Sequence, residues 1–375
     1  MRRIVSFFLL LSLLTGALPA FCEAPVSAAH QIVISFTGDC TLGCDPRERG
    51  QETGFETFIE KYGYEYPFAN VKELFEQDDL TVVNLEGPFY NEDLNPKADT
   101  KYHFRGSTDL VNILTVSGVE ACSIANNHTD DYGAAGIEST IQTLEAAGID
   151  WFGTLNSGTE GMYIFEKDGV KIGFVAVFIS DWWVPGTPTK VKEQMQALKA
   201  EGCNLLIACM HGGVEYDVRH EMNQEKLADQ LIRYGAQIVV GHHPHTIQGI
   251  REQDGVCTLW SLGNFVFGGN SSIVITRPKS PNNGKINLNT YIAQFTLYFD
   301  ENNTYLGHQL NIIPCYVTGT AADNLNNYQP ILVSGADAEK VLKAIQDDTT
   351  PRKLKLNPYV DGVGAVQDFV PAPAQ

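Results

Sequence analysis

The segment VVGHHPHTIQG, residues 239–249, places the imidazoles of His242, His243 and His245 directly behind an apolar stretch that is typical of a buried strand. The chain has nine histidines in 375 residues, so this short segment concentrates a large share of them. Pro244 stiffens the backbone between two of the three. Imidazoles gathered at a strand end can bind a metal ion or transfer protons, and either role needs partner side chains from elsewhere in the chain.

The elements that must position such partners alternate between strand and helix. Apolar segments predict strands at 32–36, 80–85, 121–124, 172–177, 205–210, 238–240 and 258–262. Between them, helices are predicted at 68–76, 108–117, 134–146, 190–199 and 224–234, and a last one follows at 336–347. Segments 291–300 and 309–315 are predicted to form an antiparallel strand pair. The alternation predicts an α/β sandwich, and the continuous apolar strands indicate sheets covered on both faces.

Polar donors follow many of these strands. Asp39 follows the first strand, Asn84 and Glu86 the second, and Asn127 and His128 the third. His211, the three clustered histidines and Asn264 follow later strands. Because sites in open α/β sheets form at the carboxyl ends of strands, we expect these side chains to converge.

The expected donor set contains two carboxylates, one carboxamide and four imidazoles. It suits Zn²⁺, Mn²⁺ or Fe, and it is too rich in imidazole for Mg²⁺ or Ca²⁺ alone. A carboxylate can bridge two such cations roughly 3.5–4 Å apart, which together activate a water molecule. Each residue also has a purely structural interpretation: Asp39 as a turn residue, Asn127 and His128 as a helix cap, and His211 as a core histidine.

Six segments in this order resemble the motif series of the CapA-type poly-γ-glutamate capsule synthesis proteins, within the calcineurin-like metallophosphoesterase superfamily. The segments are GDCTLG, NLEGPF, ANNHTDDYG, HGGVEY, GHHPHTIQG and SLGNFVFG. The resemblance extends from about Ile32 to Asp347. It implies a four-layer α/β/β/α sandwich with a centre of two divalent metal ions, Mn, Zn or Fe, at the strand ends.

The resemblance also implies roles for individual residues. Asp39 would bind the first metal, Glu86 would bridge both in place of the usual Asp, and Asn127 would bind the second. His128 would protonate the leaving group or stabilise the transition state. His211 matches the single-histidine motif. His243 and His245 match the final His-x-His pair, with His242 as an alternative first member.

Two positions depart from the family pattern. The superfamily begins with Asp-x-His, whereas this chain has Asp39, Cys40 and Thr41, so one metal site lacks an imidazole and is expected to bind its metal weakly. The Cys40 side chain should point to the opposite face of the strand. Gly212 stands where the family often has an aromatic residue, which predicts a wider wall at that point.

Five further residues are candidates for substrate contact or for supporting the ligands. Asp131 could orient His128 or cap the following helix. Arg105 could hold a substrate carboxylate or phosphate, or form a surface salt bridge. Asn264 could line the site or brace a loop. Asn84 and Glu215 complete the set, with Glu215 expected at the rim beside Tyr216.

The composition restricts the partners. With a net charge of −19 and no basic stripe, the chain is not expected to bind nucleic acid. An anionic polymer or its precursor would need local positive charge, which metal ions would supply. The cysteines beyond residue 24 are odd in number and scattered, so no disulfide framework is predicted.

Three segments of the chain are distinguished. Residues 1–24 are predicted to be a secretory signal or an uncleaved N-terminal membrane anchor, residues 30–350 the metallophosphatase-like domain, and residues 351–375 a flexible tail. We therefore expect an extracytoplasmic protein, either secreted or anchored. The leading hypothesis is a metal-dependent hydrolase or transferase of capsule or cell-envelope polymer synthesis, with poly-γ-glutamate as the implied substrate class. The alternative is a non-catalytic accessory subunit of a membrane polymer synthase that uses its metal site to hold a polyanion.

Overall fold

The computed structural model describes residues 28–93, 96–98, 101–155, 158–274 and 288–374. The predicted signal or anchor segment, residues 1–24, lies outside the described residues. Across the described residues, no helix combines the length and the apolar character needed to cross a membrane.

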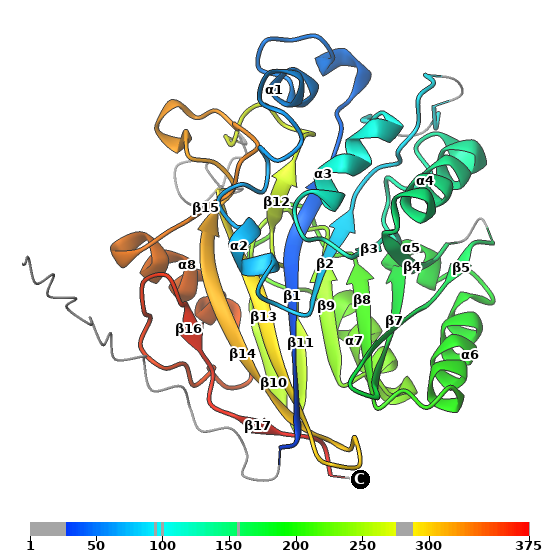
Figure 1. Ribbon diagram of the computed structural model, residues 1–375, viewed down its shortest axis with the longest axis vertical. Coiled ribbons are helices and arrows are strands. Elements are labelled where there is room, and N and C mark those ends of the chain that lie inside the picture. The colour runs from blue at the N-terminus through cyan, green and yellow to red at the C-terminus, as the bar shows by residue number, and fades with distance from the viewer. Residues whose placement is uncertain (1–27, 94–95, 99–100, 156–157, 275–287, 375) are drawn as a thin grey trace, which may run out of the picture.

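Two sheet sections pack face to face at the centre of the molecule (Figure 1). In the first section β14, β13, β1, β2, β3 and β4 lie side by side. In the second the order is β6, β7, β8, β9, β11 and β10. Strand β4 joins the two sections, because it also pairs with β7 and the short β5 (Glu160–Gly161).

The strands of the first section are β1 (His30–Thr41), β2 (Leu80–Leu85), β3 (Ala121–Ser123), β4 (Asp150–Thr154), β12 (Asn264–Phe267), β13 (Asn289–Phe299), β14 (Tyr305–Tyr316) and β15 (Ile331–Leu332). Those of the second are β6 (Tyr163–Lys167), β7 (Val170–Phe178), β8 (Leu205–His211), β9 (Ile238–His242), β10 (Ile250–Gln253) and β11 (Val256–Leu259).

Alternating side chains divide the apolar residues between three clusters. In β9, Ile238 and Val240 face the core between the sheets, whereas Val239 faces the helices outside. In β2, Val82 faces the same central core and Val83 the opposite helical layer. Successive strand residues point to opposite faces, so each apolar strand contributes to two layers at once.

Helices cover both outer faces of the sandwich. The helices α1 (Phe55–Tyr62), α2 (Lys72–Phe75), α3 (Asn112–Thr115) and α4 (Gly133–Ala147) pack on the first section. The second is covered by α5 (Ile179–Trp182), α6 (Thr187–Ala200) and α7 (Met222–Tyr234). A last helix, α8 (Gly335–Asp348), packs against β10 and β14 at the edge of the central core. The predicted four-layer α/β/β/α class is therefore confirmed by the arrangement of the layers.

Local signals explain several helix boundaries. The predicted helix over 134–146 is α4, which ends at Gly148 in the left-handed conformation with φ of 73°. Helix α7 begins with a reciprocal capping box between Glu221 and Gln224, which satisfies two backbone donors of its first turn. The region predicted as one helix over 68–76 forms only the single turn of α2. Helix α1 was not predicted, since eight residues carry only a short apolar pattern.

The C-terminal segment, residues 351–375, which the sequence predicts to be a flexible tail, contains short strands. Its described residues form β16 (Ala365–Val366) and β17 (Val370–Pro371), both antiparallel to β14. The Gln367 N–H donates to the Leu310 carbonyl at 2.7 Å, and the Ala372 N–H to the Leu306 carbonyl at 2.8 Å. The outer edge of β14 offers unpaired backbone groups, and the segment satisfies them despite its Pro- and Ala-rich composition.

A close approach at the end of β1 positions the first candidate ligand. A Cβ atom at Gly38 would lie 2.1 Å from the Gly263 carbonyl oxygen, so only glycine fits there. The pairing of β1 with β2 shifts register between Phe36 and Asp39, and Asp39 then pairs with Asn264 of the parallel strand β12. The irregularity brings Asp39 and Asn264 together at the strand ends.

Candidate metal centre

Four candidate ligands from separate strand ends meet in one cluster. Asp39 lies near the end of β1, Glu86 directly after β2, Asn127 after β3, and His211 at the end of β8. One donor atom each from Asp39, Glu86 and His211 lies within 4.8 Å of the others. The Oδ1 atom of Asn127 lies 2.7 Å from Nε2 of His211. The structure thus brings together the four residues that the strand-end argument grouped.

Two of the clustered histidines complete the group. His243 Nδ1 lies 3.1 Å from His211 Nε2. His245 Nδ1 lies 3.2 Å from Asp39 Oδ2, and its Nε2 lies 3.7 Å from Glu86 Oε1. Both residues adopt the left-handed region, with φ of 100° at His243 and 55° at His245, which residues bearing a Cβ atom rarely do. Such strained backbone persists where the surrounding structure enforces it, and functional sites are common among those places.

His242, the alternative first member of the His-x-His pair, has a different environment. It ends β9 as a regular strand residue, and its Nε2 donates to the Thr37 carbonyl at 3.0 Å. This hydrogen bond connects β9 to β1. His243 and His245, rather than His242, contact the other candidate ligands.

The side chain of Glu86 is the least satisfied group in the cluster. It is fully buried, and neither of its carboxylate oxygens has a hydrogen-bond partner among the described residues. The imidazole nitrogens His245 Nε2 and His128 Nε2 lie 3.7 and 3.9 Å from Oε1. A buried carboxylate without partners is costly, and a divalent cation would satisfy it. The donor chemistry around Glu86 therefore fits a metal ion.

Charge and burial set the protonation of these groups. Burial raises the pKa of Glu86 well above its usual range, because the opposing charge of His245 does not cancel the desolvation. Burial and the neighbouring imidazole of His245 lower the pKa of His243 to about 3, and burial with the adjacent histidines lowers that of His211. Both imidazoles are therefore neutral near pH 7, the form that binds a metal.

The pKa of His245 shifts in the opposite direction. Burial by itself lowers its pKa, but the negative charges of Glu86 and Asp39 outweigh that effect and raise it to about 9. Burial by itself likewise raises the pKa of Asp39, but the hydrogen bond from His245 outweighs it and the pKa is lowered. A metal ion that binds here would displace the His245 proton, so binding is coupled to proton release.

His128 presents one imidazole nitrogen to the cluster and binds a carboxylate with the other. Its Nδ1–H donates to Asp131 Oδ2 at 2.7 Å, and Asp131 also accepts the Phe104 N–H at 2.7 Å. Helix α4 begins at Gly133 with Tyr132 at its N-cap position, so Asp131 does not cap it. Of the two predicted roles for Asp131, the structure shows the one that orients His128.

Two asparagines hold the ligands in place. Asn84 Nδ2 donates to Asp39 Oδ1 at 2.9 Å and lies 3.3 Å from His211 Nδ1. Asn264 Oδ1 lies 2.9 Å from His245 Nδ1, which leaves Nε2 directed toward Glu86. Asn264 was expected after a strand; it instead begins β12. Hydrogen bonds of this kind fix the ring orientation and the tautomer of a metal-binding histidine.

The structure shows the surroundings of Cys40 and Thr41, the two residues that follow Asp39 in place of the Asp-x-His motif. Cys40 points into the helical layer of α1–α4, as predicted, and is a free thiol. Thr41 occupies the position of the missing imidazole, and its hydroxyl oxygen is buried without a hydrogen-bond partner among the described residues. Residues two apart on a strand share a face, so this oxygen lies on the side of Asp39.

At Gly212 the structure differs from the predicted wider wall. A Cβ atom there would lie 2.4 Å from the Ile179 side chain. Ile179 of α5 thus fills the space that a larger residue would need.

Arg105 forms a salt bridge, whereas Glu215 is exposed near the cluster. The Arg105 guanidinium donates to Asp93 Oδ1 and to the Tyr90 carbonyl, both at 2.7 Å, so the structure shows the salt bridge that was its alternative. Glu215 is exposed, and its charge reaches the cluster, since it contributes to raising the pKa of Glu86 and His245. The rim position predicted for Glu215 agrees with both observations.

Aromatic rings surround the imidazoles, and sequence patterns did not reveal them. Phe104 packs on His128 with ring centroids 4.3 Å apart. Phe178 lies edge-on to His211 at 6.0 Å, and Phe267 edge-on to His245 at 5.0 Å. Phe104 lies in the YHFRGS segment directly before Arg105, and Phe178 lies directly after a predicted strand. Neither position has a sequence pattern that predicts a site residue. Apolar walls exclude water and strengthen the electrostatic interactions of the cluster.

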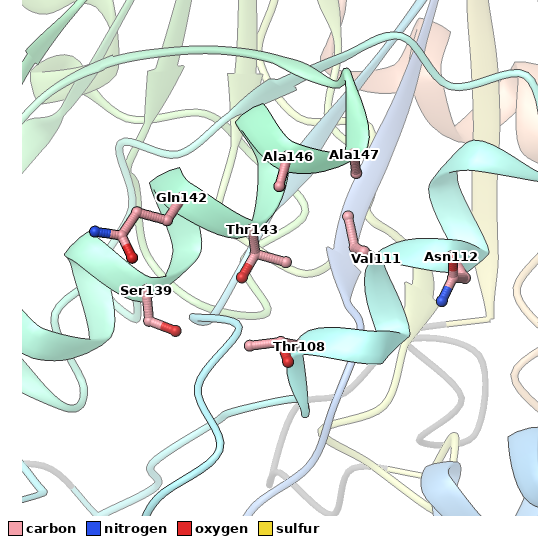
Figure 2. Close-up of a pocket in the computed structure, with 8 residues that line it drawn as sticks. All are labelled: Thr108, Val111, Asn112, Ser139, Gln142, Thr143, Ala146 and Ala147. Carbon is pink, nitrogen blue, oxygen red and sulfur yellow. The ribbon is translucent and has the colours of Figure 1, made fainter.

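A pocket elsewhere in the molecule has different chemistry. It lies between α4 and the turn before α3, has a volume of about 500 Å³, and contains none of the candidate ligands (Figure 2). Its lining is Thr108, Val111, Asn112, Ser139, Gln142, Thr143, Ala146 and Ala147. Hydroxyl, amide and methyl groups without a carboxylate or an imidazole supply neither metal binding nor acid–base catalysis.

With this geometry established, similarity to known proteins identifies the family. The family described as "Bacterial capsule synthesis protein PGA_cap" matches residues 33–269, more than half of the chain, and the chain belongs to it. All the candidate ligands lie within the matched residues.

The chain is similar to proteins of Bacillus anthracis, Bacillus subtilis and Mycobacterium tuberculosis. The chain is 29% identical to "Capsule biosynthesis protein CapA" of Bacillus anthracis over 256 residues, which cover 64% of this chain and 60% of that protein. It is 27% identical to "PGA biosynthesis protein CapA" of Bacillus subtilis, covering 62% of each chain. It is also 27% identical to "Probable polyglutamine synthesis accessory protein Rv0574c" of Mycobacterium tuberculosis, covering 50% of this chain and 55% of that one. The chain thus spans less than two thirds of the length of these relatives.

The solved structures that are similar in fold to this chain, at low TM-scores, include phosphoesterases. The calcineurin-like phosphoesterase YfkN of Bacillus subtilis gives a TM-score of 0.42 at 17% identity, covering 85% of this chain and 96% of that one. Purple acid phosphatase PPD1 of yellow lupin gives 0.41 at 12% identity, covering 88% of this chain and 58% of that one. These scores are too low to support an argument about function, so the family assignment rests on the sequence match.

Proposed function

We propose that this protein is a metal-dependent hydrolase or transferase in the synthesis of capsule or cell-envelope polymer. The observation that supports the proposal most strongly is the buried Glu86 carboxylate, which has no hydrogen-bond partner in the described part of the chain and lies among Asp39, His211 and His245. The names of the Bacillus relatives, which refer to capsule and PGA biosynthesis, supply the biological setting. We propose poly-γ-glutamate as the substrate class, as the motif resemblance implies.

The residues divide into two groups around Glu86. Asp39 and His245 lie on one side, and Asn127, His211 and His243 form the other. Divalent cations at these groups, Mn, Zn or Fe, would polarise the scissile bond and lower the pKa of a bound water. The ring nitrogen of His128 that Asp131 does not bind faces this centre, which suits it to protonate a leaving group.

The charge of the protein supports a role for cations in substrate binding. The chain carries a net charge of −19, which repels an anionic polymer or its precursor. In the cluster, the Asp39 carboxylate, whose pKa is lowered by the hydrogen bond from His245 despite its burial, adds further negative charge. Bound cations would reverse the local sign and allow carboxylates of the polymer to approach.

Two variants test the assignment of roles. His128→Ala should leave the metal content of the purified protein nearly unchanged and lower turnover by on the order of 10²–10⁴, the usual contribution of a positioned acid or base. His211→Ala should lower metal occupancy, and activity only as a consequence. Turnover is measured on a panel of phosphoesters and γ-glutamyl peptides, alongside metal analysis. Loss of the metal in His128→Ala would refute the division of roles between Asn127 and His128.

A second candidate function is a non-catalytic accessory subunit of a membrane polymer synthase. It is favoured by the name of the Mycobacterium tuberculosis relative, an accessory protein. In that case the metal centre would hold a polyanion without cleaving it. Polymer yield in cells distinguishes the two: the accessory function predicts normal yield with His128→Ala and no polymer with His211→Ala, whereas the enzymatic function predicts loss in both.

We also propose that the protein acts outside the cytoplasm, secreted or anchored. The support is the composition of residues 1–24, two arginines followed by an apolar run and small residues. Fusing the first 30 residues to a reporter that is active only outside the cytoplasm tests the proposal. An inactive reporter would reject it.

A further inference from the structure

A second group of metal-binding side chains lies inside the sandwich, away from the strand-end cluster. One donor atom each from Glu252, Cys257 and His308 lies within 4.8 Å of the others. Glu252 of β10 and Cys257 of β11 face each other across an antiparallel pair, and His308 belongs to β14 of the other sheet section. The group therefore spans the two sheets.

Two side chains of this group are fully buried, and the third is partly exposed to solvent. Cys257 and His308 are fully buried, and the Glu252 side chain is 14% exposed. Glu252 Oε2 lies 3.0 Å from His308 Nε2. Glu252 also forms a side-chain hydrogen bond with Cys257. A carboxylate, a thiol and an imidazole thus contact one another in a buried group, and a divalent cation that binds there would replace the protons that they share.

The hydrogen bond on the other side of His308 suits metal binding. The Tyr305 hydroxyl lies 2.8 Å from His308 Nδ1. When Nδ1–H donates to this hydroxyl, the lone pair of Nε2 points toward Glu252 and is free to bind a cation. This pattern, in which one ring nitrogen is held by a hydrogen bond and the other binds the metal, is general among metal-binding histidines.

We propose that Glu252, Cys257 and His308 form a Zn²⁺ site that connects the two sheet sections. A set of one thiolate, one imidazole and one carboxylate suits Zn²⁺ and disfavours Mg²⁺ or Ca²⁺. Ligand atoms around a tetrahedral zinc lie about 3–4 Å apart, given bond lengths of about 2.0–2.3 Å, so the observed group needs only a small contraction. Water from the exposed side of Glu252 completes the coordination. The strand-end centre contains no thiol ligand, so the two sites differ in a way that spectroscopy can detect.

Cobalt substitution of the full-length chain tests the proposal. The protein is stripped of metal with a chelator and titrated with Co²⁺, and the near-ultraviolet absorption of a thiolate–cobalt bond is recorded. The wild type and His211→Ala should both show the band, because the site is independent of the strand-end centre. Cys257→Ser should lose the band and bind one equivalent less of Zn²⁺. Cys315→Ser, another fully buried cysteine outside the group, is the matched control and should keep both.

Three outcomes would overturn the proposal. A wild type without the band would mean that the group is held by hydrogen bonds alone. A band that survives in Cys257→Ser but disappears in Cys40→Ser would place the thiolate at the strand-end centre instead. Should Cys257→Ser fail to fold, His308→Gln replaces it, with folding verified by circular dichroism; a folded His308→Gln that retains the wild-type band and zinc equivalents contradicts the proposal equally.

Discussion

The strand-end cluster and the group between the sheets both combine carboxylates with imidazoles, but only the second contains a thiol, and their backbone settings differ. At the strand ends, His243 and His245 have positive φ angles, and ligands come from loops that follow β2, β3 and β9. Between the sheets, Glu252, Cys257 and His308 all lie within regular strands. Loops that converge can bring many donors together and still leave an approach for substrate, whereas strands that face each other bring few donors and bury them.

This difference indicates different roles. The strand-end cluster includes His128, an imidazole held by Asp131 and available for proton transfer. In the group between the sheets the one imidazole is fully buried in the core. A metal in the first setting can do chemistry beside His128, whereas a metal in the second would be enclosed between the sheets and would connect them.

The largest effect is expected from Glu86→Gln, which replaces the candidate ligand carboxylate at the middle of the strand-end cluster with an amide. Metal affinity there should fall by more than the roughly 10–100-fold that changes to supporting residues cause. The thermal stabilisation that added metal gives the wild type should shrink accordingly, whereas the metal-free variant should be at least as stable as the metal-free wild type, since a buried unpartnered carboxylate is gone. Thermal unfolding with and without metal measures both.

The matched control for this prediction is Glu215→Gln, an exposed carboxylate near the same cluster. It should retain the metal-dependent stabilisation. Equal losses in the two variants would show that general negative charge, rather than Glu86 as a ligand, attracts the metal.

A smaller effect is expected from Asn264→Ala, which removes the hydrogen bond to His245 Nδ1. The ring would lose one constraint on its orientation, and metal affinity at the strand-end centre should fall about 10–100-fold. Competition with a chromophoric chelator measures the affinity. The thiolate–cobalt band of the group between the sheets should be unchanged, and a parallel loss of that band would contradict the independence of the two sites.

The smallest effect is expected from a change at His220. This histidine contacts carboxylates but belongs neither to the strand-end cluster nor to the group between the sheets. Its Nδ1 lies 2.8 Å from Asp348 Oδ2. Burial alone lowers the pKa of His220, but the hydrogen bond with Asp348 outweighs it and raises the pKa above 6.5. The protonated pair therefore stabilises the fold fully below about pH 6.5, the unfolded value, and this contribution is lost as the pH rises through the folded pKa.

His220→Gln should thus remove part of the pH dependence of stability. The difference between the variant and the wild type should be on the order of 1 kcal/mol below pH 6 and should shrink toward pH 9. Thermal unfolding across this range checks it. A difference that grows with pH would mean that the neutral imidazole, rather than the charged one, stabilises the fold.

Much of the fold was predictable because the apolar patterns of its strands are strong. The strands predicted over 80–85, 205–210 and 238–240 are present with boundaries shifted by two residues at most. The C-terminal strands β16 and β17 were not predictable, since each has two residues and forms only because β14 has an open edge. Such pairing depends on tertiary context that a local pattern does not contain.

The strand-end cluster was predictable to the level of residues, because a strand end and a polar donor are adjacent in sequence. The sequence did not predict that His243 and His245, rather than His242, contact the other candidate ligands. This difference depends on the left-handed backbone at His243. The group between the sheets gave no sequence signal. Glu252 and Cys257 meet across a hairpin, and His308 comes from a distant strand whose register places it opposite them.

Anomalous diffraction from crystals of the full chain grown with Mn²⁺ or Zn²⁺ tests the central claim most directly. The account predicts an anomalous peak within about 2.0–2.5 Å of a Glu86 carboxylate oxygen, with Asp39, His211 and His245 around it. A map from crystals that contain the metal, but with no peak beside Glu86, would contradict the claim that this cluster is a metal centre.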